Sequence, residues 1–355
     1  MKFLLSKEEE KKLIALFEQY DNNYEYNHYV GRATYDDQYT LLGKRAKKLE
    51  KYKTALEKKD AAFDILEKVY PIKNDFVKKT IRWETKVLET KHLEANPYYK
   101  ALKSISFNEG EYRLEYPEIK AYALCYYGEE YAYGANYAIN MSLAMIDHDF
   151  SYPSIYKKGL EWMSLSPYEM RTYEVPIALA KGHVLVLGLG IGYFAYMASL
   201  KEEVTDIHIV EGDPKLVEVF RKHLLPLFPH PEKIHIDRLV PFTFYDTVED
   251  KDYDYIFCNM WFGVTYGAAD YLTVKHHFDT FKYTQCVYYL ENTMITYLRT
   301  LVVGIMKQEY YHEPDQRTVL EIHIACKLED YEIKDSNDID SLLNLKGLNG
   351  IFSDY

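Results

Sequence analysis

The 355-residue chain has few cysteines and few glycines, and it lacks both an excess of positive charge and any long apolar run. Its four cysteines, Cys125, Cys258, Cys286 and Cys326, lie far apart and form no Cys-x-x-Cys pair. This spacing argues against a disulfide framework and against a cysteine-rich metal site. We therefore expect reduced thiols and a cytoplasmic protein.

The charge and hydropathy of the chain argue against two classes of partner. The formal net charge is −12, whereas nucleic-acid binders need clustered lysine and arginine. No apolar run approaches the ~18 residues that a membrane-spanning helix needs. The apolar start, residues 1–5, is too short for a signal peptide. We expect neither a nucleic-acid partner nor a membrane partner.

Common catalytic motifs are missing as well. The chain has no Gly-x-Ser-x-Gly elbow and no phosphate-binding P-loop. A histidine lies beside acids at 147–149 and 312–313, and two histidines are adjacent at 276–277. None of these groups matches a spaced ligand set such as His-Glu-x-x-His. The sequence predicts no metal site.

The first hundred residues predict helices. A capping box at Ser6 and Glu9 predicts a helix start, residues 21–40 resemble a loop, and a long charged helix should run to Pro71. The apolar residues that recur every seven positions in that helix are Leu42, Leu49, Leu56 and Phe63. Another helix, with Phe76, Trp83 and Val87, should stop before Pro97. We expect a helical N-terminal domain at 1–104; packing within this bundle and a homodimer seam both stay open.

The remaining chain divides into three further parts. Residues 105–165 predict a β-hairpin around Asn108-Glu109-Gly110 followed by an aromatic, irregular lead-in. Residues 166–330 alternate between strand and helix patterns, and residues 331–355 resemble a tail. The expected strands are 183–187, 206–210, 234–237, 255–259, 285–290 and 319–326. The alternation predicts an α/β fold with a doubly wound, mostly parallel, Rossmann-like sheet.

A cluster of glycines follows the first of these strands. Gly188, Gly190 and Gly192 fall within five positions, although the whole chain has only 16 glycines. A tight turn from strand to helix needs positive φ and bare backbone, and the helix start then offers free N–H groups to an anionic group. Glu211 ends the next strand, nineteen positions after Gly192. A carboxylate there can accept hydrogen bonds from both hydroxyls of a ribose.

The spacing of the glycines favours S-adenosylmethionine over NAD as cofactor. The NAD fingerprint Gly-x-Gly-x-x-Gly has its third glycine where this chain has Tyr193. Pyrophosphate needs more naked backbone than such a turn offers, whereas the methionine carboxylate of S-adenosylmethionine can meet the glycine turn.

Three segments carry a resemblance to a known family. Residues 184–192, 209–214 and 253–259 resemble the class I S-adenosylmethionine-dependent methyltransferase superfamily, and within it the spermidine-synthase-like branch. Residues 162–169 are similar to lead-ins of uncharacterised bacterial relatives. The resemblance spans roughly residues 160–300. It implies a methyltransferase-like fold with S-adenosylmethionine as cofactor and S-adenosylhomocysteine as product.

The resemblance also implies which residues hold the cofactor. The implied positions are Gly188, Leu189, Gly190, Gly192, Tyr193, Glu211, Gly212, Asp213, Asp237 and Asn259. The family usually has an Asp for the adenine amino group where this chain has Val240. Three alternatives stay open: Asp237 holds the adenine amino group, a backbone carbonyl holds it, or the cofactor is bound weakly.

A second departure concerns the reaction. Aminopropyltransferases have an acid after the fourth strand, where this chain has Asn259. An amide cannot act as a general base, so polyamine synthesis is disfavoured. Methyl transfer needs little acid–base chemistry, because the sulfonium is already activated and positioning supplies most of the rate.

These considerations lead to a methyltransferase acting on an unknown small-molecule or protein acceptor. Asn259 and Trp261 are the candidates for positioning the acceptor in catalysis. The candidates for substrate binding are Tyr168, Glu169, Met260, Trp261 and Glu291. Two alternatives stay open: an aminopropyltransferase, and a degenerate methyltransferase-like module that binds without turnover.

Overall fold

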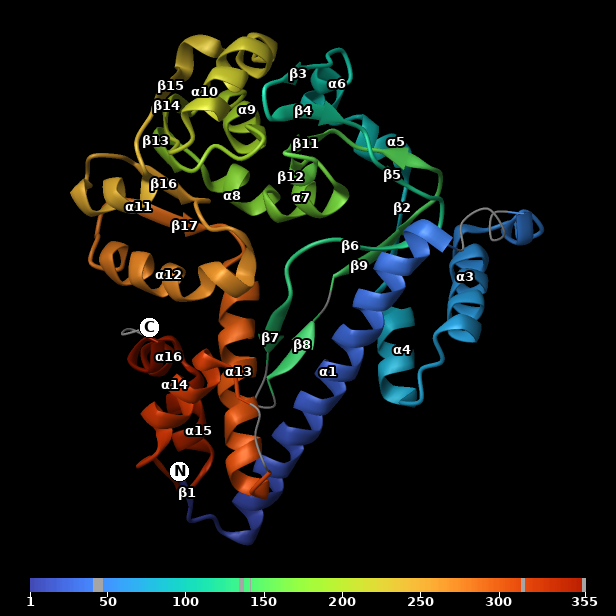
Figure 1. Cartoon of the computed structure of the whole chain (residues 1–355), viewed down its shortest axis with the longest axis vertical. Coiled ribbons are helices and arrows are strands. Elements are labelled where there is room, and N and C mark those ends of the chain that lie inside the picture. The colour runs from blue at the N-terminus through green and yellow to red at the C-terminus, as the bar shows by residue number, and fades with distance from the viewer. Residues whose placement is uncertain (41–46, 134–136, 141, 314–316, 353–355) are drawn as a thin grey trace.

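The computed structural model describes residues 1–40, 47–133, 137–140, 142–313 and 317–352. It is a mixed α/β structure that contains helices, several small sheets and one larger sheet, which lies to one side of the molecule in Figure 1.

The larger sheet has five strands, all parallel. They are β13 (Gly182–Leu187), β14 (Val204–Val210), β15 (Ile234–Asp237), β16 (Tyr255–Cys258) and β17 (Gln285–Tyr288). Their order is β15-β14-β13-β16-β17, so the chain changes direction across the sheet at β13. Leu187 pairs with Val210 on one side and with Cys258 on the other. The carboxyl ends of these three strands therefore meet at one edge, and five of the six predicted strands are confirmed as a parallel sheet.

The central strand is apolar along its length because it is covered on both faces. Residues 184–187 are all buried, as a parallel strand between helices requires. The helices that follow the five strands are α9 (Tyr193–Ser199), α10 (Pro214–Val219) with the π-helical turn Phe220–Leu224, α11 (Pro241–Phe244), α12 (Gly263–Phe278) and α13 (Glu291–Tyr311). Phe194 of α9 stacks on Phe257 of β16 at 4.4 Å between ring centroids.

The N-terminal part contains long helices but not at every predicted place. Its elements are α1 (Lys7–Thr40), α3 (Ala55–Val69), α4 (Asp75–Glu84), β2 (Lys86–Leu88), α5 (Thr90–Glu94) and α6 (Pro97–Leu102). The loop predicted at 21–40 is wrong, because that segment continues α1 (Figure 1). Tyr26, Val30 and Ala33 are buried at helical spacing, so tertiary packing outweighs the turn preference of the neighbouring Asn and Asp residues.

The long helix predicted up to Pro71 is also shorter than expected. Among the described residues 47–71 the long helix is α3, and Leu42 lies outside the described residues. Within α3, Phe63 is buried whereas Leu56 is 61% exposed, so these two heptad positions do not share one seam. Val87 belongs to β2, which pairs with β9 (Leu143–Ile146), and not to the preceding helix. The segment 1–104 is therefore not all helical, and a homodimer through it stays a prediction.

The segment 105–165 forms strands where irregular structure was expected. The predicted hairpin is confirmed: β3 (Asn108–Glu109) pairs with β4 (Tyr112–Glu115). The other strands of this part are β5 (Glu118–Ile119), β6 (Leu124–Tyr126), β7 (Tyr131–Tyr133), β8 (Ala138–Asn140), β9, β10 (Phe150–Ser151), β11 (Ser154–Lys157) and β12 (Leu160–Ser164). Two short helices, α7 (Pro167–Thr172) and α8 (Glu174–Leu179), lead into the parallel sheet.

The C-terminal part corrects two expectations. The strand predicted at 319–326 is wrong: Thr318 and Glu321 form a capping box that starts the helix α14 (Val319–Leu328). The predicted tail contains β18 (Glu332–Ile333), α15 (Ser336–Leu343) and α16 (Leu345–Phe352). Because β18 pairs with β1 (Lys2–Phe3), both ends of the chain lie in the same region (Figure 1).

Candidate functional site

The glycine turn after β13 passes directly against the neighbouring strand end. Gly188 has φ +94°, and a Cβ added there would lie 2.1 Å from the carbonyl oxygen of Asn259. Gly192 has φ +83° and caps α9, where a Cβ would meet the ring of Phe220 at 2.9 Å. From the N-terminal part, the Tyr98 hydroxyl donates to the carbonyl of Ile191 at 2.7 Å. The turn is thus held from three sides, which explains why glycine occupies it.

Glu211 connects this turn to the end of β14. The amide of Leu189 donates to its Oε2 at 3.1 Å, and the amide of Asp213 donates to its Oε1 at 2.8 Å. Each carboxylate oxygen has a second lone pair, so both can still accept one more hydrogen bond. The carboxylate therefore lies next to the glycine turn in a fixed orientation.

A cavity of about 870 Å³ opens at this edge of the sheet. The predicted site residues that line it are Tyr168, Glu169, Gly188, Leu189, Gly190, Glu211, Gly212, Asp213, Asn259, Met260 and Trp261. Its volume lies in the range of cavities that hold small molecules and nucleotide cofactors. The structure thus brings most of the predicted residues into one cavity.

Four predicted residues lie outside this cavity lining. They are Gly192, Tyr193, Asp237 and Glu291. The Tyr193 ring is buried and its hydroxyl accepts a hydrogen bond from Asn96 at 2.9 Å. Asp237 contacts the His208 ring nitrogen at 3.0 Å, and Glu291 accepts a hydrogen bond from Tyr271 at 2.7 Å. Asp237 therefore contacts a histidine of the inner strand β14 and lies outside the cavity lining, and its predicted role at the adenine stays a prediction.

Asn259 and Trp261 line the cavity, and a side-chain N–H group of each already donates a hydrogen bond within the protein. The Asn259 side chain donates to the Tyr173 hydroxyl at 2.9 Å. The Trp261 indole N–H donates to the carbonyl of Tyr289 at 2.9 Å, and the ring is buried. Trp261 thus offers the cavity an apolar surface and no free donor.

Glu169 on α7 has the most perturbed carboxyl group of the cavity. Burial raises its pKa to about 7; the charge of Glu161 adds to this effect, and a hydrogen bond from the Tyr289 hydroxyl at 2.8 Å opposes it. A carboxyl group that titrates near neutral pH can both accept and release a proton.

Asp213 lines the cavity but has a structural role. Its Oδ1 accepts the amides of Lys215 and Leu216 and caps α10, while its Oδ2 accepts the Tyr112 hydroxyl at 2.5 Å and the Lys157 ammonium at 2.7 Å. Burial works against ionisation of this carboxyl. The hydrogen bonds from Lys157, Tyr112 and Leu216 outweigh burial and lower the pKa to about 2.

Replacing Asp213 with Asn is therefore expected to destabilise the protein by about 1–3 kcal/mol, because Lys157 and Tyr112 lose a charged partner. Urea titration at pH 7 measures this loss. Glu218→Gln, on the same helix but paired only loosely with Arg238 at 3.5 Å, serves as control. Equal stability of the two variants would contradict the structural role of Asp213.

Sequence reasoning missed several aromatic residues of the cavity. They are Trp162, Tyr173, Phe262 and Tyr289. Trp162 and Phe262 stack at 5.0 Å between ring centroids, and Tyr173 packs on Tyr289 at 4.9 Å. Tyr289 directly follows the fifth strand, and this position at the sheet edge could have revealed it.

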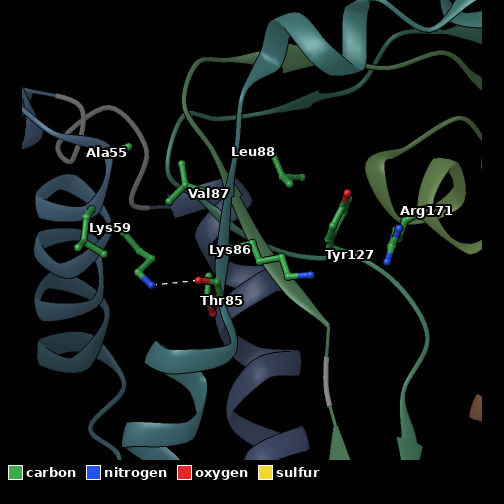
Figure 2. A pocket seen from close by; sticks show the side chains of 9 residues that line it. Ala55, Lys59, Thr85, Lys86, Val87, Leu88, Tyr127 and Arg171 are labelled. Carbon is green, nitrogen blue, oxygen red and sulfur yellow. Dashed lines mark hydrogen bonds between the residues drawn. The ribbon is translucent and has the colours of Figure 1, made fainter.

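A separate cavity of about 610 Å³ lies near α3 and β2, away from the glycine turn (Figure 2). The Lys59 ammonium donates there to the carbonyls of Arg82 and Thr85, each at 3.0 Å. The Lys59 ammonium therefore joins α3 to the last turn of α4 and to Thr85, which follows it.

Two kinds of feature are missing from the described residues. Among the residues described, no cluster of His, Cys, Asp and Glu has three members placed to hold a metal ion. Within the same ranges, none of the helices has the length and apolar character needed to cross a bilayer.

Comparisons with known proteins find similarity among solved structures alone. No protein-family model matches the chain, and no curated protein matches it. The spermidine synthase from Thermotoga maritima is similar with a TM-score of 0.31 and 12% identity, over 43% of this chain and 59% of that one. A spermidine synthase in complex with the transition state analogue AdoDATO gives the same score and identity, over 43% and 58%. The matched part thus spans under two thirds of either chain, and a TM-score this low does not establish a common fold.

Proposed function

We propose that the chain is an S-adenosylmethionine-dependent methyltransferase with a doubly wound, Rossmann-like cofactor domain. The observation that supports this most is the position of Glu211, whose carboxylate joins the glycine turn to the end of β14 at the wall of the 870 Å³ cavity. Ligands of parallel α/β sheets bind at this edge, beside the point where the strand order reverses.

The roles of the residues follow from their positions. The free lone pairs of Glu211 would accept the ribose hydroxyls, and the turn at Gly188–Gly190 would meet the methionine end of the cofactor. The adenine would be held without an acid, because Asp237 lies outside the cavity lining. The acceptor is a small molecule or a protein side chain, and the four unpaired cysteines agree with a cytoplasmic location.

A second candidate is an aminopropyltransferase. The observation in its favour is Glu169, which offers the cavity a proton acceptor that Asn259 cannot provide. Product analysis with decarboxylated S-adenosylmethionine and putrescine separates the two reactions. Cofactor binding without turnover on any acceptor would favour a binding module.

Calorimetric titration with S-adenosylmethionine tests the proposal. Glu211→Ala should weaken binding by about 1–3 kcal/mol, because two hydrogen bonds to the ribose are lost. Asp237→Ala is the matched control, since it removes an acid from the next strand outside the cavity lining, and it should leave the affinity unchanged. Absence of binding at millimolar cofactor rejects the proposal.

A further inference from the structure

Glu169 lies in the wall between two cavities. One is the site cavity at the glycine turn, and the other has a volume of about 460 Å³. The two cavities share Ser164, Tyr168 and Glu169 in their linings, and Tyr126 and Glu130 line the second one further away. The two cavities therefore adjoin each other at the Glu169 side chain.

The hydrogen bonding of Glu169 leaves it available to a ligand. The Tyr289 hydroxyl donates to one carboxylate oxygen, Oε2, at 2.8 Å, and a carboxylate has further lone pairs that can accept hydrogen bonds from a ligand. Glu130 and Glu161 add two more carboxyl groups to the second cavity, and its described lining contains no Lys, Arg or His. The carboxyl groups of Glu130, Glu161 and Glu169 in the second cavity thus carry negative charge when ionised, with no basic side chain of its described lining to offset it, which favours a cationic ligand.

We propose that Glu169 is the general base of the transfer and that the acceptor is an amine, which reaches the cofactor through the second cavity. This inference rests on the proposed function of the site cavity.

The step balances in charge and atoms. The acceptor enters as an ammonium ion and gives one proton to the Glu169 carboxylate. The nitrogen lone pair then forms a bond to the methyl carbon of the sulfonium, while the carbon–sulfur bond breaks and its electron pair stays on sulfur. The products are the neutral thioether S-adenosylhomocysteine and an N-methylammonium ion.

The environment of Glu169 suits a base that works near neutral pH. Burial raises its pKa to about 7, which is close to the best value for proton transfer under these conditions. The titratable groups that face it are Glu130 beyond β6, Glu161 of β12, Tyr168 of α7, Tyr173 between α7 and α8, and Tyr289 after β17. Asn259 lies in the same cavity but cannot accept the proton.

Methyl transfer from S-adenosylmethionine to small probes tests the inference. The amine probes are n-hexylamine, cyclohexylamine and phenethylamine, and the comparison set is n-hexanol, n-hexanethiol and hexanoate. We expect methylated product from amines alone, with a rate that rises with pH through about 7. Glu169→Gln should lower this rate by roughly 10²–10⁴-fold and leave the affinity for S-adenosylmethionine within twofold.

Two further variants separate a base from a structural residue. Glu169→Asp should retain part of the rate. Tyr289→Phe should move the rise in rate to higher pH, because the hydrogen bond from Tyr289 lowers the pKa of Glu169. Glu118→Gln, an exposed acid on β5, is the control and should change neither rate nor pH profile.

The outcomes distinguish this inference from the function on which it rests. A Glu169→Gln variant as active as the parent, or transfer to the comparison set instead of the amines, overturns the inference. So does a lack of transfer to every amine by a protein that binds S-adenosylmethionine, and in that case the cofactor site still stands. If the protein does not bind S-adenosylmethionine, both the inference and the proposed function are overturned.

Discussion

Gly188→Ala is expected to lower the free energy of unfolding by about 3 kcal/mol or more, and to abolish cofactor binding. The added Cβ would lie 2.1 Å from the carbonyl oxygen of Asn259 in a backbone with φ +94°. Neither backbone segment can move easily, because both are held by hydrogen bonds. The Gly188 amide donates to the carbonyl of Val210 at 2.9 Å, and the Asn259 amide donates to the carbonyl of Leu187 at 2.8 Å. Backbone strain and overpacking each cost about 1–3 kcal/mol.

Two glycine variants separate the contributions. Gly159→Ala introduces a similar strain, with φ +86°, but no atom lies within 4 Å of the added Cβ. Gly31→Ala lies within α1, also in open space, and should stabilise the protein by about 0.5–1 kcal/mol. Urea titration of the three variants measures their free energies of unfolding and so gives the order of their stabilities. A Gly188→Ala loss no larger than that of Gly159→Ala would show that the close approach to Asn259 does not restrict this position.

The parallel sheet and its glycine turn could be predicted because their signals are local. The apolar run 184–187 and the glycines that follow it lie within nine residues, and the positive φ of Gly188 and Gly192 is a property of the turn itself. The placement of Glu211 beside the turn follows from the parallel register of β13 and β14.

Segments whose structure depends on distant partners could not be predicted in this way. The predicted strand 319–326 alternates apolar residues with Glu321 and His323 in the manner of a strand. Ile324 and Leu328 are nevertheless the buried positions, four residues apart, as a packed helix requires. Similarly, α1 extends through polar residues because Tyr26 and Val30 are packed in a hydrophobic cluster formed with distant parts of the chain.

The chemistry of the site depends on contacts across the chain. Glu169 and Tyr289 are 120 positions apart, and Tyr112 reaches Asp213 over 101 positions. No local pattern indicates that one of these carboxyls has a raised pKa and the other a lowered one. Asp213 followed the motif of the resemblance, yet its lone pairs serve the helix cap and two side chains instead of a ligand.

The protein is also expected to lose stability as the pH rises from about 4.5 to about 7. Burial raises the pKa of Glu130 to about 7, and burial is also the main cause of the raised pKa of Glu169, again about 7. In this pH window both groups are ionised in the unfolded chain and protonated in the folded chain. A rise in pH therefore stabilises the unfolded state relative to the folded state. Stability from these groups is complete below pH 4.5 and is lost by the time the pH passes 7. The loss is on the order of 3 kcal/mol for each group, and smaller where water enters the cavity.

Thermal unfolding and urea titration at pH 5 and pH 8 measure this dependence. Glu130→Gln should remove about half of the difference between the two pH values, and the double variant with Glu169→Gln most of it, because glutamine does not titrate. The groups around Glu130 that share its environment are Tyr126, Glu129, Glu161 and Tyr168. Among them, burial also raises the pKa of Glu129, so part of the loss should survive in the double variant.

Glu118→Gln on the exposed side of β5 should keep the parent's pH dependence. If the Glu130→Gln variant keeps it too, the carboxyl group is hydrated in the folded protein and the cavity around it is open to water.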